Sequence, residues 1–209
     1  MKTRSFWVLG LMGIVSLASV WAADKHPYKL DGTFVEGCSC KQPCAAAFIS
    51  FDPGCKWIGA MAISAGSYQG SDLAGVKLAM VQGAEKWVRI YLDVPNKKQH
   101  AAAEAFARAY LTDFGTVEAV KDAKVEITGN AGKFTVKVDD GKILQFASEP
   151  VLGRDKKTPV THANVLDPVM TTYSQGKTLN ADFKDDKRSF KLEDSNAFYN
   201  DRMTCSGEL

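Results

Sequence analysis

The cysteines of this chain are concentrated in one short segment. Cys38, Cys40, Cys44 and Cys55 lie within residues 38–55, and the fifth, Cys205, lies far along the chain. Thiols this close in sequence can be joined as disulfides, can bind a soft metal ion, or can exchange electrons with thiols of another protein. Their positions in the sequence are compatible with all three chemistries, so the secondary structure around them is needed to distinguish the three.

The Cys-x-Cys pair favours chelation over a disulfide. Cys38 and Cys40 end a predicted strand, and because side chains alternate along a strand, both face the same side. Their Cβ atoms would lie about 6 to 7 Å apart, whereas a disulfide requires about 4 Å. A tetrahedral metal ion with sulfur bonds of about 2.3 Å holds its ligands about 4 Å apart, which two leaning side chains can reach. Pro43 turns the chain, so Cys44 can supply a third sulfur.

Three thiolates in a short loop point to a soft metal ion. They suit Cu(I) or Zn(II) far better than calcium or magnesium, which prefer oxygen ligands. Cu(I) is the predicted ion because three ligands satisfy it, and Zn(II) is the competitor, which would want a fourth ligand. His162 is the predicted further ligand. Glu36, on the strand face of the pair, is predicted either to tune the site or to lie on a solvated edge.

Cys55 and Cys205 are predicted to form a disulfide, because Cys55 lies eleven residues beyond Cys44 and Cys205 otherwise has no partner. Two alternatives stay open for the cysteines as a set. They can form purely structural disulfides in a secreted β-rich binding module. They can also serve a thiol–disulfide oxidoreductase, although Cys-x3-Cys is not the Cys-x2-Cys of redox motifs.

The first residues predict export. Lys2 and Arg4 precede an apolar run from Phe6 to Val20, followed by small residues, which is typical of a secretory signal peptide over residues 1–22. The run is shorter than the roughly 20 residues that span a bilayer, so no membrane span is expected after signal removal. The predicted location is periplasmic or secreted, where disulfides persist.

The mature chain, residues 23–209, is predicted to be a neutral single domain. Removing Lys2 and Arg4 takes the formal charge from +2 to 0, which argues against a nucleic acid partner. The remaining 187 of the 209 residues are enough for one domain with a proper core, so the cysteines are not needed as staples.

Hydrophobic periodicity predicts an α+β domain in which a twisted, mainly antiparallel sheet carries one main helix. Alternation at period two predicts strands over residues 28–40, 56–64, 76–83, 87–94, 124–129, 133–138 and 142–153, and two short strands within 177–203. Residues 96–115 are rich in alanine and predict the helix, which Gly115 ends. Its predicted buried stripe consists of His100, Ala103, Ala107, Tyr110 and Phe114.

The cysteine segment resembles a known bacterial family. The pattern Tyr-x-Leu-x-Gly-x-Phe-x-Glu-x-Cys-x-Cys-x3-Cys from Tyr28 to Cys44, the later Pro-Gly-Cys at Cys55, and the stretches 63–75, LGRDKKTPV and SNAFYND are similar to the family catalogued as domain of unknown function 1326. Its members commonly carry Cys-x-Cys-x3-Cys-Pro-Cys, and Ala46 stands here in the last cysteine's place. The resemblance implies no established activity, but it supports treating the four clustered cysteines as a unit.

The sequence thus predicts an exported soft-metal protein, most readily for copper, that stores the ion or passes it on and performs no reaction on a substrate. A metal ion is the expected ligand, and a membrane or periplasmic metal-handling protein is the expected partner.

Overall fold

The computed structural model describes residues 25–48 and 54–209; the predicted signal peptide lies outside them. The strands are β1 (Pro27–Cys38), β2 (Trp57–Tyr68), β3 (Ser71–Asp72), β4 (Lys77–Gln82), β5 (Trp87–Asp93), β6 (Thr116–Asp122), β7 (Val125–Asn130), β8 (Lys133–Val138), β9 (Leu144–Pro150), β10 (Thr161–Ala163), β11 (Thr172–Asp185) and β12 (Arg188–Glu208). The helix α1 covers His100–Tyr110, and the short 3-10 turns are η1 (Ala45–Ala47), η2 (Lys97–Gln99) and η3 (Asp139–Gly141). In the described part of the chain, no helix has both the length and the apolar character needed to cross a membrane.

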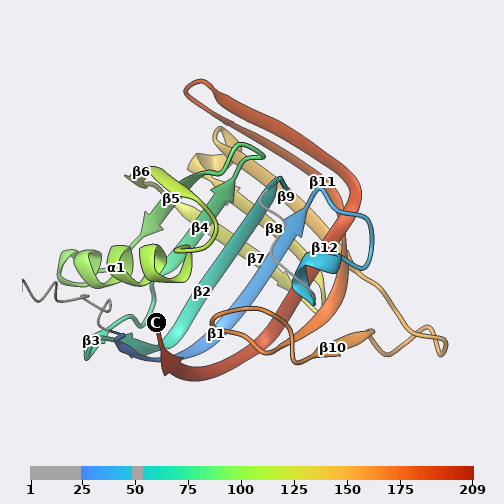
Figure 1. Ribbon diagram of the computed structural model, residues 1–209, viewed down its shortest axis with the longest axis horizontal. Coiled ribbons are helices and arrows are strands. Elements are labelled where there is room, and N and C mark those ends of the chain that lie inside the picture. Colours follow the sequence, from blue (N-terminus) through green and yellow to red (C-terminus); the bar gives the residue numbers. More distant parts are fainter. Residues whose placement is uncertain (1–24, 49–53) are drawn as a thin grey trace, which may run out of the picture.

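The strands form one sheet in the order β6-β5-β4-β2-β1-β12-β11-β9-β8-β7, with β3 and β10 paired to β2 and β11 (Figure 1). Neighbours along this order are antiparallel except β5 and β6, which are parallel because α1 connects them as a crossover. The predicted fold class, a single α+β domain with a mainly antiparallel sheet and one main helix, is therefore confirmed.

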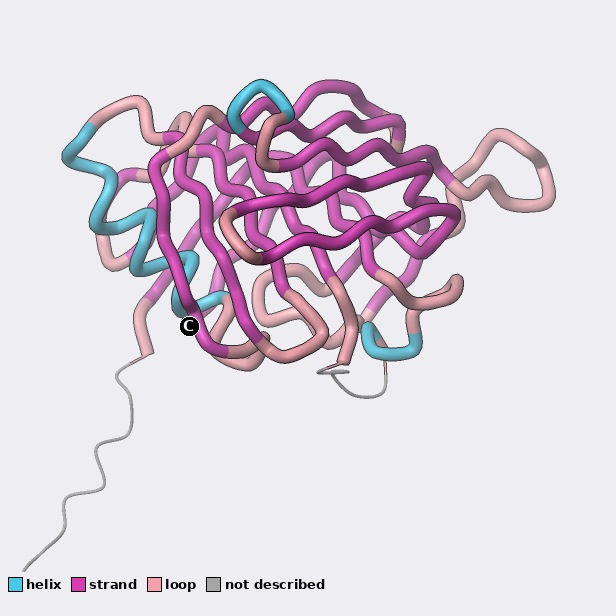
Figure 2. The backbone as a smooth tube through the Cα atoms, turned by 90° about the horizontal axis from the view of Figure 1, so that it is seen from above, coloured by secondary structure: helices cyan, strands magenta, loops and turns pink. Residues whose placement is uncertain are grey.

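The sheet curls back on itself and buries both of its faces (Figure 2). Alternate residues of a central strand serve different cores: on β2, Ile58 and Ala60 pack in the core enclosed by the curl, whereas Trp57 and Met61 pack on the outer face. We call these the inner core and the outer core. The outer core is covered by α1 and by residues 165–170, so a side chain at the end of β1 can be buried on that side.

Helix α1 covers the outer core with the face that its sequence predicts. Ala103, Ala107 and Tyr110 are buried along it, together with Phe106. His100 differs from the prediction: it is one-third exposed and its Nε2 lies 2.7 Å from Asp122 Oδ1. The first turn of the helix holds His100 at the edge of the sheet, where a charged partner is available.

The sheet differs from the sequence prediction in the length of β11 and β12 and in the strands β3, β6 and β10, which were not predicted. The two short strands expected within residues 177–203 are the long strands β11 and β12, of 14 and 21 residues. They extend this far because β12 pairs with β11 over residues 188–199 and with β1 over residues 196–208, which supplies hydrogen-bond partners for a segment with many exposed side chains. Strand β6 was not predicted, because none of its residues is buried and its apolar alternation is weak.

An ion-pair network closes one end of the inner core. Arg89 Nη1 lies 2.7 Å from Asp185 Oδ2, and both side chains are more than nine-tenths buried. Lys121 Nζ lies 2.8 Å from the other carboxylate oxygen, and the Tyr91 hydroxyl donates to Asp185 at 2.7 Å. Burial opposes the charge on Asp185, but the bonds from Lys121, Tyr91 and Arg89 prevail and keep the pKa of Asp185 below its ordinary value.

Candidate functional site

The sheet register places four side chains of the site in one row. Cys38, the last residue of β1, lies opposite Asn196 of β12 on one side and Trp57 of β2 on the other. Trp57 in turn lies opposite Gln82 of β4. Directly opposed residues of antiparallel strands face the same side of a sheet, so all four side chains point toward the outer core at the strand ends.

The predicted thiol trio is brought together around Cys38, the second residue of this row. The Sγ atoms of Cys38, Cys40 and Cys44 all lie within 4.8 Å of one another. Cys38 and Cys44 are buried, and Cys40 is half-buried at the surface. Among the described residues, this is a group that could hold a metal ion. The distances fit the roughly 4 Å sulfur spacing of a thiolate-bound ion after small side-chain rotations.

Asn196 fastens the cysteine loop to the sheet. The backbone N–H of Cys44 donates to Asn196 Oδ1 at 3.2 Å, and Asn196 Nδ2 donates to Cys38 Sγ at 3.6 Å. The loop is also held by Gln42, whose Nε2 donates to the carbonyl of Gly176 on β11 at 2.9 Å. These bonds position two of the three sulfur atoms through one fully buried amide, which is how outer groups commonly orient metal ligands.

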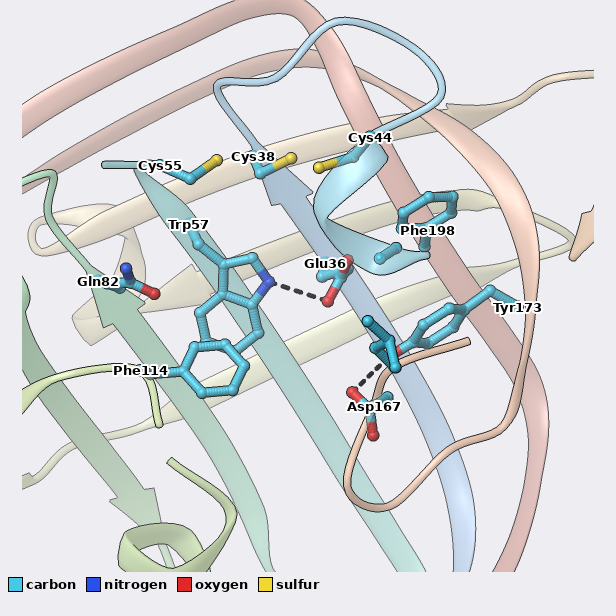
Figure 3. Close-up of a pocket in the computed structure, with 12 residues that line it drawn as sticks. Glu36, Cys38, Cys44, Cys55, Trp57, Gln82, Phe114, Asp167, Tyr173 and Phe198 are labelled. Carbon is cyan, nitrogen blue, oxygen red and sulfur yellow. Dashed lines mark hydrogen bonds between the residues drawn. The ribbon is translucent and has the colours of Figure 1, made fainter. Parts of the chain in front are cut away.

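Cys55 lies beside the trio rather than beside Cys205. Its Sγ is 2.9 Å from Cys40 Sγ and 3.5 Å from Ser39 Oγ, and the side chain is buried. Figure 3 shows the sulfur atoms of Cys55, Cys38 and Cys44 along one edge of a cavity. The structure thus gathers the four cysteines of the segment into one group, which we call the thiol cluster.

The structure does not pair Cys55 with Cys205, the predicted disulfide, because neither residue is in a disulfide. Cys205 is paired with Leu30, eight positions along β1 from Cys38. At about 3.3 Å per residue this is roughly 26 Å along the strand, whereas a disulfide needs Cα atoms within about 7 Å. The pairing of β12 with β1 therefore carries Cys205 to the opposite end of the strand from the cluster.

The clustered thiols have different acidities because they share hydrogen bonds. Hydrogen bonds from Cys38, Cys40 and Cys44 lower the pKa of Cys55 below its ordinary value. The sulfur contact with Cys40 is the largest cause that raises the pKa of Cys38. The pKa of Cys40 is also raised, because its contacts with Cys44 and Cys55 outweigh the opposite effect of Cys38. Hydrogen bonds to the Cys55 sulfur thus stabilise its thiolate form relative to its thiol form.

A cavity of about 60 Å³ lies beneath the thiol cluster. Its floor and walls are mostly aromatic and apolar, and they include Ala47, Trp57, Phe114, Leu166, Tyr173 and Phe198. Three polar side chains also line it: Glu36, Gln82 and Asp167 (Figure 3). The sulfur atoms therefore face a small, mostly apolar space, and its aromatic walls would cover a bound ion on that side.

Glu36 lies on the same strand face as Cys38, as predicted, and is buried rather than on a solvated edge. Trp57 Nε1 donates to Glu36 Oε2 at 2.9 Å. The indole reaches this position because residue 59 is glycine: a Cβ at Gly59 would lie 2.3 Å from the Trp57 ring. Burial raises the pKa of Glu36 well above its ordinary value, and the hydrogen bond from Trp57 opposes that shift.

Asp167 is the anchor of the segment that closes the cavity. The Tyr110 and Tyr173 hydroxyls donate to Asp167 Oδ2, the former at 2.8 Å. The backbone N–H groups of Val169 and Met170 donate to Asp167 Oδ1 at 2.7 and 2.6 Å. Burial raises the pKa of Asp167, and the hydrogen bonds oppose that effect. The two tyrosine hydroxyls tie Asp167 to α1 and β11, and the two backbone donors close the turn of residues 167–170, which is a structural role.

Gln82 is a fully buried amide that lacks a partner. It is 0% exposed, and among the described residues neither its Nε2 nor its Oε1 has a hydrogen-bond partner. Such a group costs free energy in the folded state. Gln99 is a useful contrast, since it is also buried but its Nε2 donates to the carbonyl of Ala74 at 2.9 Å.

We therefore expect Gln82→Met to leave the protein as stable as the wild type or to raise its free energy of unfolding, by about 1 kcal/mol, because an apolar side chain of similar length removes an unpartnered amide. Gln99→Met, the matched control, should lose about 1 kcal/mol or more because it leaves the carbonyl of Ala74 unpaired. Urea denaturation of the three proteins checks both signs. Destabilisation by Gln82→Met as large as that by Gln99→Met would show that the Gln82 amide is satisfied.

His162, the predicted further ligand, is not in the group of potential ligand atoms among the described residues. Its Nε2 lies 3.0 Å from Gln175 Oε1, and Gln175 Nε2 donates to Asn196 Oδ1 at 2.9 Å. The His162 ring also packs against Phe48, with ring centroids 5.0 Å apart. His162 is therefore connected to Cys38 through the side chains of Gln175 and Asn196. The Sγ atom of Cys55, which is 2.9 Å from Cys40 Sγ, takes the position next to the trio that was predicted for His162.

Several residues of the site could not be identified from sequence patterns. Asn196 lies within the predicted strands of residues 177–203 and in the stretch SNAFYND, which assign it no role, and Gln82 and Asp167 have no motif around them. They join the site only through the pairing of strands and the folding of residues 165–170 over the outer core. Trp57 had one sequence signal, because it follows Cys55 by two residues and lies at the start of the predicted strand 56–64.

Comparisons with known proteins give no family for the chain. No protein-family model matches the sequence, and no curated protein matches it. Among solved structures it is similar to acetoacetate decarboxylase from Legionella pneumophila, with a TM-score of 0.40, 10% sequence identity, and 98% of this chain and 96% of that chain covered. It is also similar to the enduracididine biosynthesis enzyme MppR, with a TM-score of 0.38, 10% identity, and coverage of 88% and 86%. Likeness at this level carries no argument about activity.

Proposed function

We propose that this protein binds one Cu(I) ion through Cys38, Cys40 and Cys44, and that it stores the ion or passes it on. The observation that carries the proposal is the convergence of these three sulfur atoms to within 4.8 Å of one another. Sulfur ligands select soft ions, and three thiolates satisfy Cu(I). Zn(II) is the competing ion.

The surroundings of the thiols support a cargo that enters and leaves. Cys40 is half-buried at the surface, whereas Cys38 and Cys44 are buried, so an ion would meet Cys40 first and then be drawn inward. A graded path of this kind suits transfer of the ion to a membrane or periplasmic metal-handling protein. The predicted signal peptide supports a location in the periplasm or outside the cell.

Cys55 bears on the choice of metal. Tetrahedral Zn(II) would want a fourth ligand, and Cys55 offers a sulfur next to Cys40, where His162 is held by Gln175 instead. The approach of the three sulfur atoms to within 4.8 Å of one another favours metal binding over the alternative of a binding module whose cysteines are purely structural.

The test is metal titration of the fully reduced wild-type protein, with no oxygen present and with a chromophoric Cu(I) chelator as competitor. We expect one equivalent of Cu(I) to be withheld from the chelator at pH 7.5. We also expect the affinity to fall as the pH is lowered, because protons compete with the ion for the thiolates. Binding of clearly less than one equivalent would overturn the proposal.

A further inference from the structure

Cys40 and Cys55 continue the pairing of β1 with β2 beyond the last residues of the two strands. Cys38 is opposite Trp57 in the ladder, and the next pair outward is Ser39 and Lys56, whose backbones are joined from Ser39 N–H to the Lys56 carbonyl at 2.9 Å. One further step along the same register sets Cys40 opposite Cys55. Directly opposed residues of an antiparallel pair have Cβ atoms about 4.5 to 5.5 Å apart, close to the spacing in disulfides.

The two sulfur atoms are already in contact. Their separation of 2.9 Å is about 0.9 Å longer than a disulfide bond, so small side-chain rotations would close it. Cys55 is held in this position from the other side, since Ser39 Oγ lies 3.5 Å from its Sγ and accepts the backbone N–H of Lys56 at 3.0 Å. Cys40 is half-buried and accessible, whereas Cys55 is buried. The pair thus has one exposed thiol and one enclosed thiol.

From this geometry we propose that Cys40 and Cys55 form a dithiol–disulfide couple that exchanges with a thiol-disulfide partner. The Cys40 thiolate attacks a disulfide RSSR, forms the mixed disulfide Cys40–S–S–R and releases one RS⁻. The Cys55 thiolate then attacks the Cys40 sulfur and releases the second RS⁻. The protein loses two electrons and two protons, and RSSR is reduced to two RSH.

The couple has a consequence for the thiol trio, and this part rests on the proposed function. Cys40 belongs both to the trio and to the couple. Oxidation would leave only Cys38 and Cys44 as thiolate ligands, so the affinity for Cu(I) should fall at least 100-fold. Reduction would restore the third ligand and permit binding again.

The experiment equilibrates the metal-free protein in glutathione buffers of increasing GSSG content, alkylates free thiols and maps tryptic peptides. Trypsin leaves Cys38 and Cys40 on peptide 30–41 and Cys44 and Cys55 on peptide 42–56, so the wild type alone cannot identify the pair. Two double variants resolve it. Cys38→Ser/Cys44→Ser should still link the two peptides, whereas Cys40→Ser/Cys55→Ser should not link them in the same buffer.

The proposal is overturned if the Cys40→Ser/Cys55→Ser protein links its peptides as readily as the other variant, or if neither variant links them. Circular dichroism of both variants shows whether they are folded. Because the mapping uses no metal, it can succeed where copper binding fails. Cys55→Ser tests the coupling separately. When the buffer is changed from reducing to oxidising, the Cu(I) affinity of this variant should stay the same, whereas that of the wild type should fall.

Discussion

Replacing any one of Cys38, Cys40 or Cys44 by serine is expected to lower the affinity for Cu(I) at least 100-fold. Serine nearly preserves the size of the side chain but offers a hard hydroxyl oxygen in place of a soft thiolate, and two remaining thiolates do not complete the coordination that three provide. Competition with a chromophoric Cu(I) chelator measures the loss. Cys38→Ser should fold like the wild type, since its hydroxyl can still accept the hydrogen bond from Asn196.

Cys205→Ser is the matched control for these variants. Cys205 lies against the carbonyl of Leu30, at the opposite end of β1 from the thiol cluster. It carries the same chemical change and should alter Cu(I) affinity by no more than about twofold. If the three cluster variants bind as tightly as Cys205→Ser does, the trio is not the copper site.

The local part of the site could be predicted because it depends on short-range geometry. The alternation of side chains along a strand places Cys38 and Cys40 on one face, and the turn at Pro43 lets Cys44 return to them. The strand period likewise identified Glu36 as a neighbour of the pair. Interactions within a few residues are fixed by backbone geometry, which the sequence pattern reports directly.

The partner of Cys55 could not be predicted in this way. Elimination pointed to Cys205, but the pairing of β1 with β2 sets Cys55 opposite Cys40, and the pairing of β1 with β12 carries Cys205 away. Register depends on the total burial of all the strands concerned, and a shift changes the partner of every residue. Asn196 and Gln82 enter the site for the same reason, by register rather than by any local motif.

The sequence predicts the strands that have strong apolar alternation. It does not predict the extent of strands that are stabilised mainly by their neighbours in the sheet. The residues of β5 and the buried stripe of α1 carry their own signal. Strand β12 does not, because much of its outward-facing surface is polar and it is held by β1 on one side and β11 on the other. The same tertiary pairing that lengthens β12 delivers Asn196 to the cysteines.

Asp185→Asn is expected to lower the free energy of unfolding by about 3 kcal/mol at pH 7. The substitution leaves the buried guanidinium of Arg89 without its nearest carboxylate, and breaking a buried pair costs about 3 to 5 kcal/mol. The loss should be at the lower end of this range, because Asp186 Oδ2 also lies 2.9 Å from Arg89 Nη1 and remains as a partner. Asp182→Asn is the control on the same strand: its pair with Lys191 is exposed, so the loss should be below about 1 kcal/mol.

The effect of Asp185→Asn should depend on pH in a direction that the structure fixes. The folded-state pKa of Asp185 is depressed, so its contribution is fully present above the unfolded pKa of about 3.9 and is lost as the pH falls through the folded value. Asparagine resembles the protonated acid, so the difference between variant and wild type should shrink steadily as the pH is lowered below about 4. Urea denaturation at pH 7 and pH 3 measures it. A difference equally large at both values would mean that the lost stability comes from packing rather than from the charge on Asp185.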